Sequence, residues 1–482
     1  MGLGMVTKSG LGQFELAQFG IATTPVEVVR DRRRRLVQAL QKLGADFPIA
    51  LWSSRAPAKN FPANCHYFRA SSHFLYFAGL GIENAVIVLE PQGDHLTLFW
   101  DEPGPGAALW HGPEPSRDQV AAAMGADEAR SLGNLHKFID GAASIYLPDP
   151  GARLGQEAML GRSLSTSPEP EGIDGVLARA IVEVRLRHDE FAIAEIKKAV
   201  NVSIQAHTLG IQRTRNSPIE SQVCAAMEAV IYSNQCGMAY NSIVTIAGEV
   251  LHNNYYHNPL GKHDLLLADV GAETALGWAA DITRTSPVSG KFSPTQKALY
   301  DVVLDAHDQG IAAVKPGADY QDIHLLACGV LAEGLVDLGI LKGNPESLVD
   351  ADAHALFFPH GVGQLLGLDV HDMEDLGDVA GYAPGRVRSD RFGLGFLRLS
   401  RILEPGMVVT IEPGFYQVPA ILNNAEWRKS YAEMVNWDRL AEFSDVRGIR
   451  IEDDVLVTET GNEVLTADLP TDTESIEALM LS

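Results

Sequence analysis

The chain has 482 residues, of which 46% are hydrophobic, so it can bury a large core and we expect two domains. Its 62 acidic and 38 basic residues give a formal net charge of -24. Because such a surface repels phosphate backbones, we expect no nucleic-acid partner. No apolar run approaches the roughly 18 residues that a membrane span needs, so we expect no membrane association either.

The cysteines and the N-terminal residues predict the cellular compartment. The first ten residues lack the charged region followed by an apolar stretch that marks a signal peptide. The four cysteines form no Cys-x-x-Cys pair and are widely spaced, which is typical of reduced thiols: Cys65, Cys224, Cys236 and Cys328. We therefore predict a cytoplasmic protein.

The first third of the chain alternates helical and strand-like patterns. Thr24-Pro25-Val26-Glu27 matches a capping box with proline at the first helical position, and it predicts a helix that runs toward Leu43. The arginines along this helix, from Arg30 to Arg35, are expected to form a solvated face. Three strand patterns complete a small α/β domain: residues 85–90, 96–100 and 144–147.

A stretch rich in Gly, Ser, Pro and Glu, Gly151–Asp174, predicts a linker or a surface excursion. It would divide the chain into an N-terminal α/β domain, residues 1–174, and a larger domain, residues 175–482. In the larger domain we expect one long helical stretch, from about Gly175 to Thr214. Two more helices should start at capping boxes, Ser217-Pro218-Ile219-Glu220 and Ser293-Pro294-Thr295-Gln296. Short strands between and after the helices predict an α+β domain with a curved, mainly antiparallel sheet: residues 265–270, 408–411 and 449–457.

Two charged residues interrupt segments of this domain that otherwise read as buried strands. Asp269 follows the apolar run Leu265–Ala268, and Asp281 lies between Ala280 and Ile282. An isolated buried carboxylate is very costly, so each needs a cation, hydrogen-bond donors or a raised pKa. A hairpin through residues 273–277 would bring the two carboxylates face to face.

Two further carboxylates follow the same pattern. Glu412 comes directly after the strand-like segment 407–411, and Glu452 lies in the run Arg450–Asp454. Four carboxylates on adjacent strands predict a site for divalent cations, and oxygen ligands favour ions such as Mn²⁺. Capping of a turn or pairing with an arginine competes with this interpretation for any one carboxylate, but it explains all four poorly.

Three histidines belong to the same site hypothesis. His360 and His371 bracket a glycine-rich segment, and His252 follows an apolar stretch over residues 243–251. A lone histidine is more often structural than catalytic. Two that flank a glycine-rich loop between acidic strands favour a functional site.

In their order and spacing, these motifs resemble those of the pita-bread metallopeptidases, specifically the aminopeptidase P and prolidase branch. The resemblance covers nearly the whole chain and implies a C-terminal pita-bread catalytic domain behind a smaller α/β domain. The matching segments are Phe68–Gly79, Asp269–Glu273, Ala280–Thr285, His360–Gly361, Leu366–Asp372, Leu403–Gly414 and Arg450–Asp454.

The resemblance implies metal-dependent hydrolysis of Xaa-Pro bonds, in dipeptides or at peptide N-termini with proline at the second position. Asp281 and Glu452 would bridge two divalent metal ions, with Asp269 on one ion and Glu412 on the other. Such a centre makes hydroxide available near neutral pH and polarises the carbonyl before proline. Glu412 would also act as general base and pass the proton toward the proline nitrogen.

Further roles follow from the resemblance alone. His252, His360 and His371 would line the pocket and steady the substrate carbonyl and the tetrahedral intermediate. Arg450 matches an arginine that supports the metal ligands. Arg398 matches the arginine that, in prolidases, holds the terminal carboxylate of a dipeptide. Family analogy also suggests a homo-oligomer.

One position departs from the family pattern. Four residues after the position of His360 the family has a histidine ligand, and this chain has Gln364. A glutamine amide is a poorer ligand than imidazole for most transition metals, so one ion would bind weakly or be absent. This departure leaves an inactive binding protein of the same fold as the alternative function. Metal-independent chemistry of the creatinase kind is a third alternative, but without metals the carboxylates would repel one another.

Overall fold

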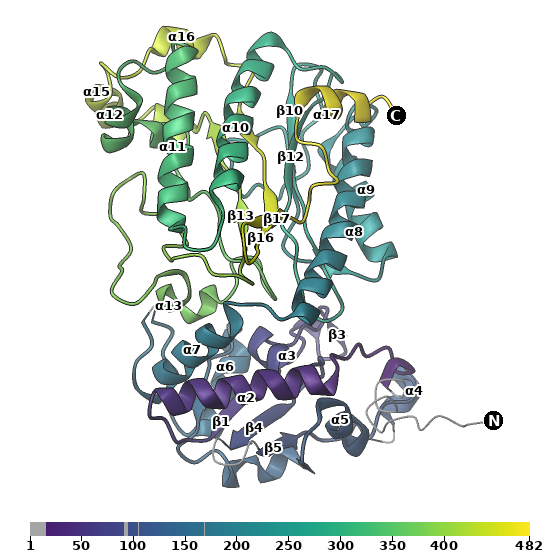
Figure 1. Cartoon of the computed structure of the whole chain (residues 1–482). Coiled ribbons are helices and arrows are strands. Elements are labelled where there is room, and N and C mark those ends of the chain that lie inside the picture. Colours follow the sequence, from purple (N-terminus) through teal and green to yellow (C-terminus); the bar gives the residue numbers. More distant parts are fainter. Residues whose placement is uncertain (1–15, 91–94, 105, 168) are drawn as a thin grey trace, which may run out of the picture. The chain divides into compact units, whose positions relative to one another are not determined.

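The computed structural model describes residues 16–90, 95–104, 106–167 and 169–482, so the N-terminal residues considered for a signal peptide lie outside the described part. The chain forms two compact units, which Figure 1 colours purple to blue and teal to yellow along the sequence. The first unit extends to Leu186 and includes two short later segments, Ala275–Gly277 and Met373–Ala380. The second unit contains the rest of the chain. No helix in the described ranges is long and apolar enough to cross a membrane.

The first unit contains a mixed five-stranded sheet in the order β6-β5-β4-β1-β7. Its central pairs, β1 with β4 and β4 with β5, are antiparallel, and both outer pairs are parallel. The strands are β1 (Ile49–Trp52), β4 (Val86–Glu90), β5 (His95–Phe99), β6 (Glu128–Arg130) and β7 (Ala143–Ser144), with a separate β2 (Ala58–Phe61) and β3 (Asn64–Cys65) pair. The helices are α2 (Val26–Lys42), α3 (Ser72–Ala78), α4 (Ala107–His111), α5 (Arg117–Met124), η1 (Leu132–Lys137), α6 (Pro150–Leu160), α7 (Gly172–Arg185), η3 (Glu374–Leu376) and, at its edge, α13 (Asp378–Gly381).

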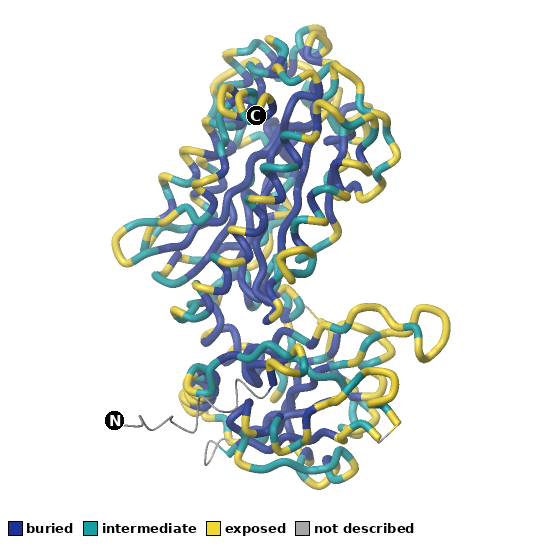
Figure 2. Tube along the Cα trace, turned by 90° about the vertical axis from the view of Figure 1, so that its right-hand side faces the viewer, coloured by how far each residue is buried: buried dark blue, intermediate teal, exposed yellow. Residues whose placement is uncertain are grey.

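The second unit is α+β, as predicted, with short antiparallel ladders between helices. Its strands are β8 (Gly237–Met238), β9 (Ile243–Thr245), β10 (Leu265–Asp269), β11 (Ala272–Glu273), β12 (Thr283–Pro287), β13 (Val408–Ile411), β14 (Gly414–Tyr416), β15 (Gly448–Arg450), β16 (Asp453–Val457) and β17 (Asn462–Val464). Its helices are α8 (Glu190–Thr214), α9 (Glu220–Ser233), α10 (Pro294–Ala313), α11 (Tyr320–Asp337), α12 (Pro345–Asp350), η2 (Ala353–Leu356), α14 (Pro419–Leu422), α15 (Ala425–Ser430), α16 (Trp437–Ala441) and α17 (Thr473–Leu479). The strands run through a buried interior, and the outer faces of the helices are exposed (Figure 2).

All five residues of β10 are buried, and alternate residues pack into one hydrophobic cluster that orients the strand. Leu266 and Ala268, together with Val270 just beyond the strand, pack into a hydrophobic cluster with Met227 of α9 and Ala206 of α8. Because successive side chains of a strand point to opposite faces, Asp269 must face away from these helices. The apolar pattern of β10 therefore sends the carboxylate to the opposite side of the sheet.

Two predictions about the first unit are wrong. The stretch 151–174 is not an open linker, because α6 occupies its first part, with the Asp149 side chain accepting a hydrogen bond from Ala152 N. Arg32 and Arg33 are buried rather than solvated. Arg33 donates to the carbonyls of Phe77 and Met124, in the last turns of α3 and α5, where helices leave carbonyls without intrahelical partners.

The predicted domain boundary at residue 174 stays a prediction. In the structure the first unit also contains all of α7, which contacts α2. The expected single helix over 175–214 is in fact two helices, α7 and α8, separated at residues 186–189. The Asp189 side chain accepts from Ala192 N and so caps the start of α8, which explains the break.

Candidate metal centre and active site

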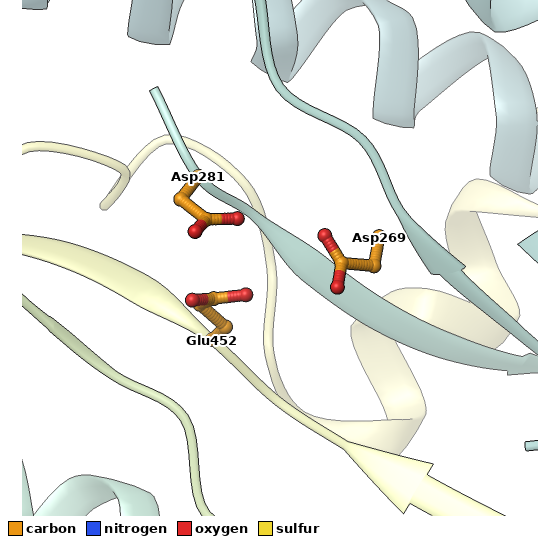
Figure 3. Close-up of side chains that lie close together, drawn as sticks. All are labelled: Asp269, Asp281 and Glu452. Carbon is orange, nitrogen blue, oxygen red and sulfur yellow. The ribbon is translucent and has the colours of Figure 1, made fainter. Parts of the chain in front are cut away.

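Three buried carboxylates from three strand ends meet in the second unit. Figure 3 shows those of Asp269, Asp281 and Glu452 facing one another, and oxygen atoms of all three lie within 4.8 Å of each other. Pairing of β10 with β12 sets Asp269 opposite Thr283, and Thr283 in turn bridges to Glu452. The hairpin predicted between Asp269 and Asp281 is therefore confirmed, and cross-strand pairing adds Glu452.

Hydrogen-bond donors occupy most of the oxygens in this cluster. Asp269 accepts from Tyr240 Oη at 2.6 Å and from Arg450 Nη2 at 2.5 Å. Glu452 Oε2 accepts from the Thr283 hydroxyl at 2.7 Å, whereas Glu452 Oε1 is buried without a hydrogen-bond partner. A buried acceptor without a donor is costly, and a cation would satisfy it.

Mutual repulsion and burial perturb these acids. Burial, with the nearby charge of Asp269, raises the pKa of Asp281 to about 7. Burial, with the charges of Asp281 and Glu412, raises the pKa of Glu452 well above its ordinary value. Both shifts oppose the ionised form, which a divalent cation would restore. Three converging carboxylates, one with an unsatisfied oxygen, fit the hard or borderline divalent cations that the sequence predicts.

The glycine-rich segment after His360 runs beside β13 and positions two further site residues. Glu412 N donates to Val362 O at 2.7 Å, and Thr410 N donates to Gln364 O at 3.0 Å. Gly363 has φ +156° and lies so close to β13 that a Cβ atom would be 2.2 Å from the carbonyl oxygen of Thr410. Only glycine allows this approach, which places Gln364 against the carboxylates.

A chain of side chains links the histidine end of the site to the carboxylates. Tyr416 Oη lies 2.8 Å from His360 Nε2 and accepts from Arg450 Nη1 at 3.0 Å. His360 Nδ1 lies 2.8 Å from Gly361 O, and a carbonyl can only accept, so Nδ1 carries the proton and Nε2 accepts from Tyr416. Burial, with the charge of Arg450, lowers the pKa of His360 to about 3, so this ring is neutral. Arg450 then reaches Asp269, as described above.

Glu412 lines the same cavity but is not among the three carboxylates that converge within 4.8 Å. Its Oε2 is 3.8 Å from His360 Nδ1. Burial raises the pKa of Glu412 to about 8, against the opposing charge of Arg450. A carboxyl group with a pKa near neutrality can exchange a proton with a reacting water, which is the property of a general base or acid.

All ten residues predicted for the site line one cavity of about 770 Å³. They are Asp269, Asp281, Glu412, Glu452, Gln364, His252, His360, His371, Arg398 and Arg450. The structure thus brings together residues from positions 252 to 452, and their individual roles stay predictions. Burial lowers the pKa of His252, so it too is neutral near pH 7. His371 adopts the left-handed region, with φ 56°, a conformation that few non-glycine residues take outside special sites.

The sequence did not reveal four other contributors to the cavity and its surroundings. Tyr240 and Tyr416 hold Asp269 and Arg450, but neither carries a local signal beyond the nearness of Tyr416 to Glu412. Phe392 and Trp427 line the cavity with stacked rings, their centroids 4.5 Å apart. These two aromatic residues lie in loop and short-helix segments, where no periodic pattern indicates which side chains turn inward.

Comparison with known proteins identifies the family. Residues 194–459 match the model of metallopeptidase family M24, and residues 29–146 match the N-terminal domain of aminopeptidase P. The chain is 32% identical to the Xaa-Pro aminopeptidase of Escherichia coli over 474 residues, covering 94% of this chain and 97% of the relative. It is 32% identical to a probable Xaa-Pro aminopeptidase of Botryotinia fuckeliana over 417 residues, covering 86% and 87% of the two chains.

Solved structures agree with this assignment. Aminopeptidase PepP of Pseudomonas aeruginosa superposes with a TM-score of 0.75 at 30% identity, covering 95% of this chain and 98% of that one. A variant of Escherichia coli aminopeptidase P in complex with substrate gives a TM-score of 0.77 at 29% identity, covering 95% and 99%. These likenesses confirm the predicted pita-bread fold with its N-terminal domain. The chain belongs to metallopeptidase family M24, in its aminopeptidase P branch.

Proposed function

We propose that the protein is an Xaa-Pro peptidase that hydrolyses the bond before a proline at the second position of a peptide. The observation that carries this proposal is the buried cluster of Asp269, Asp281 and Glu452 at one cavity with Glu412. Relatives named Xaa-Pro aminopeptidase support it. The alternative of an inactive binding protein rests on Gln364, and the buried carboxylates and these relatives weigh against it.

The cofactor is one or more divalent metal ions, and Mn²⁺ is the proposed ion because the ligands are oxygens. The cluster fits such an ion, since Glu452 Oε1 is buried without a donor. When bound, the metal would polarise the substrate carbonyl and supply hydroxide near neutral pH. A zinc-substituted form of the Escherichia coli relative exists, which is consistent with a divalent metal and leaves its identity open to measurement.

The protein's own residues would then handle the proton and the substrate. The Glu412 carboxylate would accept a proton from the attacking water and deliver it to the proline nitrogen. That nitrogen carries no hydrogen in the peptide, so it cannot be recognised as a donor and must be protonated before it leaves. Neutral His252 would donate to or accept from the substrate without adding charge.

Three side chains of the cavity would determine which peptides bind. The stacked rings of Phe392 and Trp427 offer an apolar wall for a proline ring or the residue after it. Arg398 would hold the terminal carboxylate of a dipeptide.

We further propose a cytoplasmic location, which the four free cysteines support. The homo-oligomer stays a prediction.

The test is cleavage of Ala-Pro and Ala-Pro-Leu by the purified protein supplied with Mn²⁺. We expect turnover of at least one peptide, and loss of roughly 10²–10⁴-fold in kcat for Glu412→Gln, because a positioned general base contributes about that much. Glu404→Gln is the matched control, since Glu404 pairs at the surface with Arg187 and should leave the rate unchanged. Folded, metal-supplied protein that cleaves neither peptide would refute the proposal.

A further inference from the structure

Gln364 is fixed rigidly beside the metal cluster. Only 3% of its surface is exposed, and both of its backbone polar groups are bound to Thr410 of β13. The preceding Gly363 lies against β13, where an added Cβ atom would be 2.2 Å from the carbonyl oxygen of Thr410. The side chain is therefore presented to the carboxylates in one place.

The amide of Gln364 points its donor, not its acceptor, at the cluster. Nε2 donates to Asp281 Oδ2 at 2.9 Å. When Asp281 is ionised, the opposite orientation would set two oxygens that carry no hydrogen against each other, which is repulsive. An amide nitrogen has no lone pair to offer a metal, so this contact satisfies Asp281 with a hydrogen bond instead of a cation.

The charges around the cluster match a single divalent ion. When a bound cation keeps them ionised, Asp269, Asp281 and Glu452 supply three negative charges, and Arg450, hydrogen-bonded to Asp269, offsets one of them. The two negative charges that remain equal in magnitude the charge of one divalent cation. Glu412 is not among the residues whose oxygens converge within 4.8 Å.

We propose that the Gln364 amide takes the place of a second cation, so that the centre binds one divalent ion tightly, through Asp269, Asp281 and Glu452. This proposal rests on the metal dependence of the proposed function. The unpartnered Glu452 Oε1 marks the oxygen that this ion would satisfy. Glu412 then keeps its carboxylate free of a ligand role and available to the proton.

The test counts metal ions in the whole protein. Chelator-treated protein is titrated with Mn²⁺ in a calorimeter, and the bound ion is measured by elemental analysis after gel filtration. We expect one tightly bound ion per chain in the wild type and two in Gln364→His, whose imidazole adds a ligand and should tighten the second ion at least about tenfold. Electron paramagnetic resonance should show the hyperfine lines of an isolated Mn²⁺ in the wild type and spin coupling in the variant.

Two outcomes would overturn the proposal. One is a wild type that binds two ions per chain with similar affinity, a measurement that needs no variant to fold. The other is a folded Gln364→His protein that still binds one. Gln417→His is the matched control, because Gln417 donates to Phe443 O and Val446 O and is not among the residues that line the cavity, so this variant should keep one ion. Cleavage of Ala-Pro with two bound ions would refute this inference alone, whereas one bound ion without cleavage would refute the proposed function alone.

Discussion

Removing the charge of Asp281 should stabilise the metal-free protein at neutral and alkaline pH. Burial and the neighbouring Asp269 charge raise the pKa of Asp281 from its ordinary 3.8 to about 7. This difference is roughly three units, and each unit corresponds to about 1.4 kcal/mol, so ionising Asp281 in the fold costs about 4 kcal/mol. Asp281→Asn keeps the shape and an acceptor for Gln364, and it has no charge to bury.

The sign of the pH dependence follows from which state binds the proton more tightly. Between pH 4 and 7 the folded chain holds the proton of Asp281 and the unfolded chain does not. The contribution of Asp281 to the unfolding free energy of the wild type is therefore fully present below about pH 4. It is lost as the pH rises from about 4 to about 7. The unfolding free energies of the two proteins should be similar near pH 4. At pH 8 the unfolding free energy of the variant should be higher than that of the wild type by up to about 4 kcal/mol.

Urea denaturation in the presence of EDTA, followed by circular dichroism at several values between pH 5 and 8, measures this difference. Subtracting the two proteins removes the contributions of acids that do not interact with Asp281. Glu452, whose pKa the charge of Asp281 raises, adds to the difference with the same sign. Asp301→Asn is the control, because Asp301 lies on the exposed face of α10 beside Lys297. The difference in unfolding free energy between this control and the wild type should stay constant over the same pH range. A difference for Asp281→Asn that stays constant across this range would refute the reasoning. Saturating Mn²⁺ should reverse the order, because only the wild type retains the full ligand set.

Two more substitutions test the supports of the centre. Arg284 is buried and donates to Asp453 Oδ1 at 2.7 Å and to Glu452 O at 2.7 Å. Arg284→Met should therefore lower the unfolding free energy measured in urea by about 3–5 kcal/mol. The half-exposed Arg187→Met should lower it by at most about 1 kcal/mol, and equal losses would contradict this reasoning. Tyr240→Phe removes a donor from Asp269 and should weaken Mn²⁺ binding by about 10- to 100-fold in calorimetry, whereas the exposed Tyr67→Phe should not change it.

The positions of the helices were predictable from local sequence. The capping hydrogen bonds were predictable only where no distant residue competed for the capping side chain. Ser293 and Gln296 form the predicted reciprocal hydrogen bonds at the start of α10. Glu220 does not cap α9, because it is buried and accepts hydrogen bonds from Thr245, Ile246 and Asn258. Thr24 is buried too, and its backbone N–H donates to Gly79 O before α2 begins. The motifs are alike, and only tertiary contacts, which the sequence does not display, separate them.

The acidic ligands were predictable because a charge inside an apolar strand conflicts with its surroundings, and that conflict is visible in sequence. Their supports were not, because Tyr240, Thr283 and Tyr416 are unremarkable residues that become partners only through folding. The same is true of Gln364, whose departure from the family pattern was visible. Its donor contact with Asp281 depends on the orientation of an amide, which sequence does not encode.

The loss of a histidine ligand therefore does not imply the loss of the centre. If position 364 merely lacked a ligand, Asp281 would retain an unsatisfied charge, and the fold would need a second ion or a protonated acid to tolerate it. The Gln364 amide donates a hydrogen bond to Asp281 Oδ2, so one bound ion and one hydrogen bond together satisfy the three carboxylates. Gln364→Leu, which removes the donor without adding a ligand, should thus destabilise the metal-free protein at pH 8 more than at pH 5, because only the ionised Asp281 needs the hydrogen bond. An equal loss at both values would show that Gln364 serves packing alone.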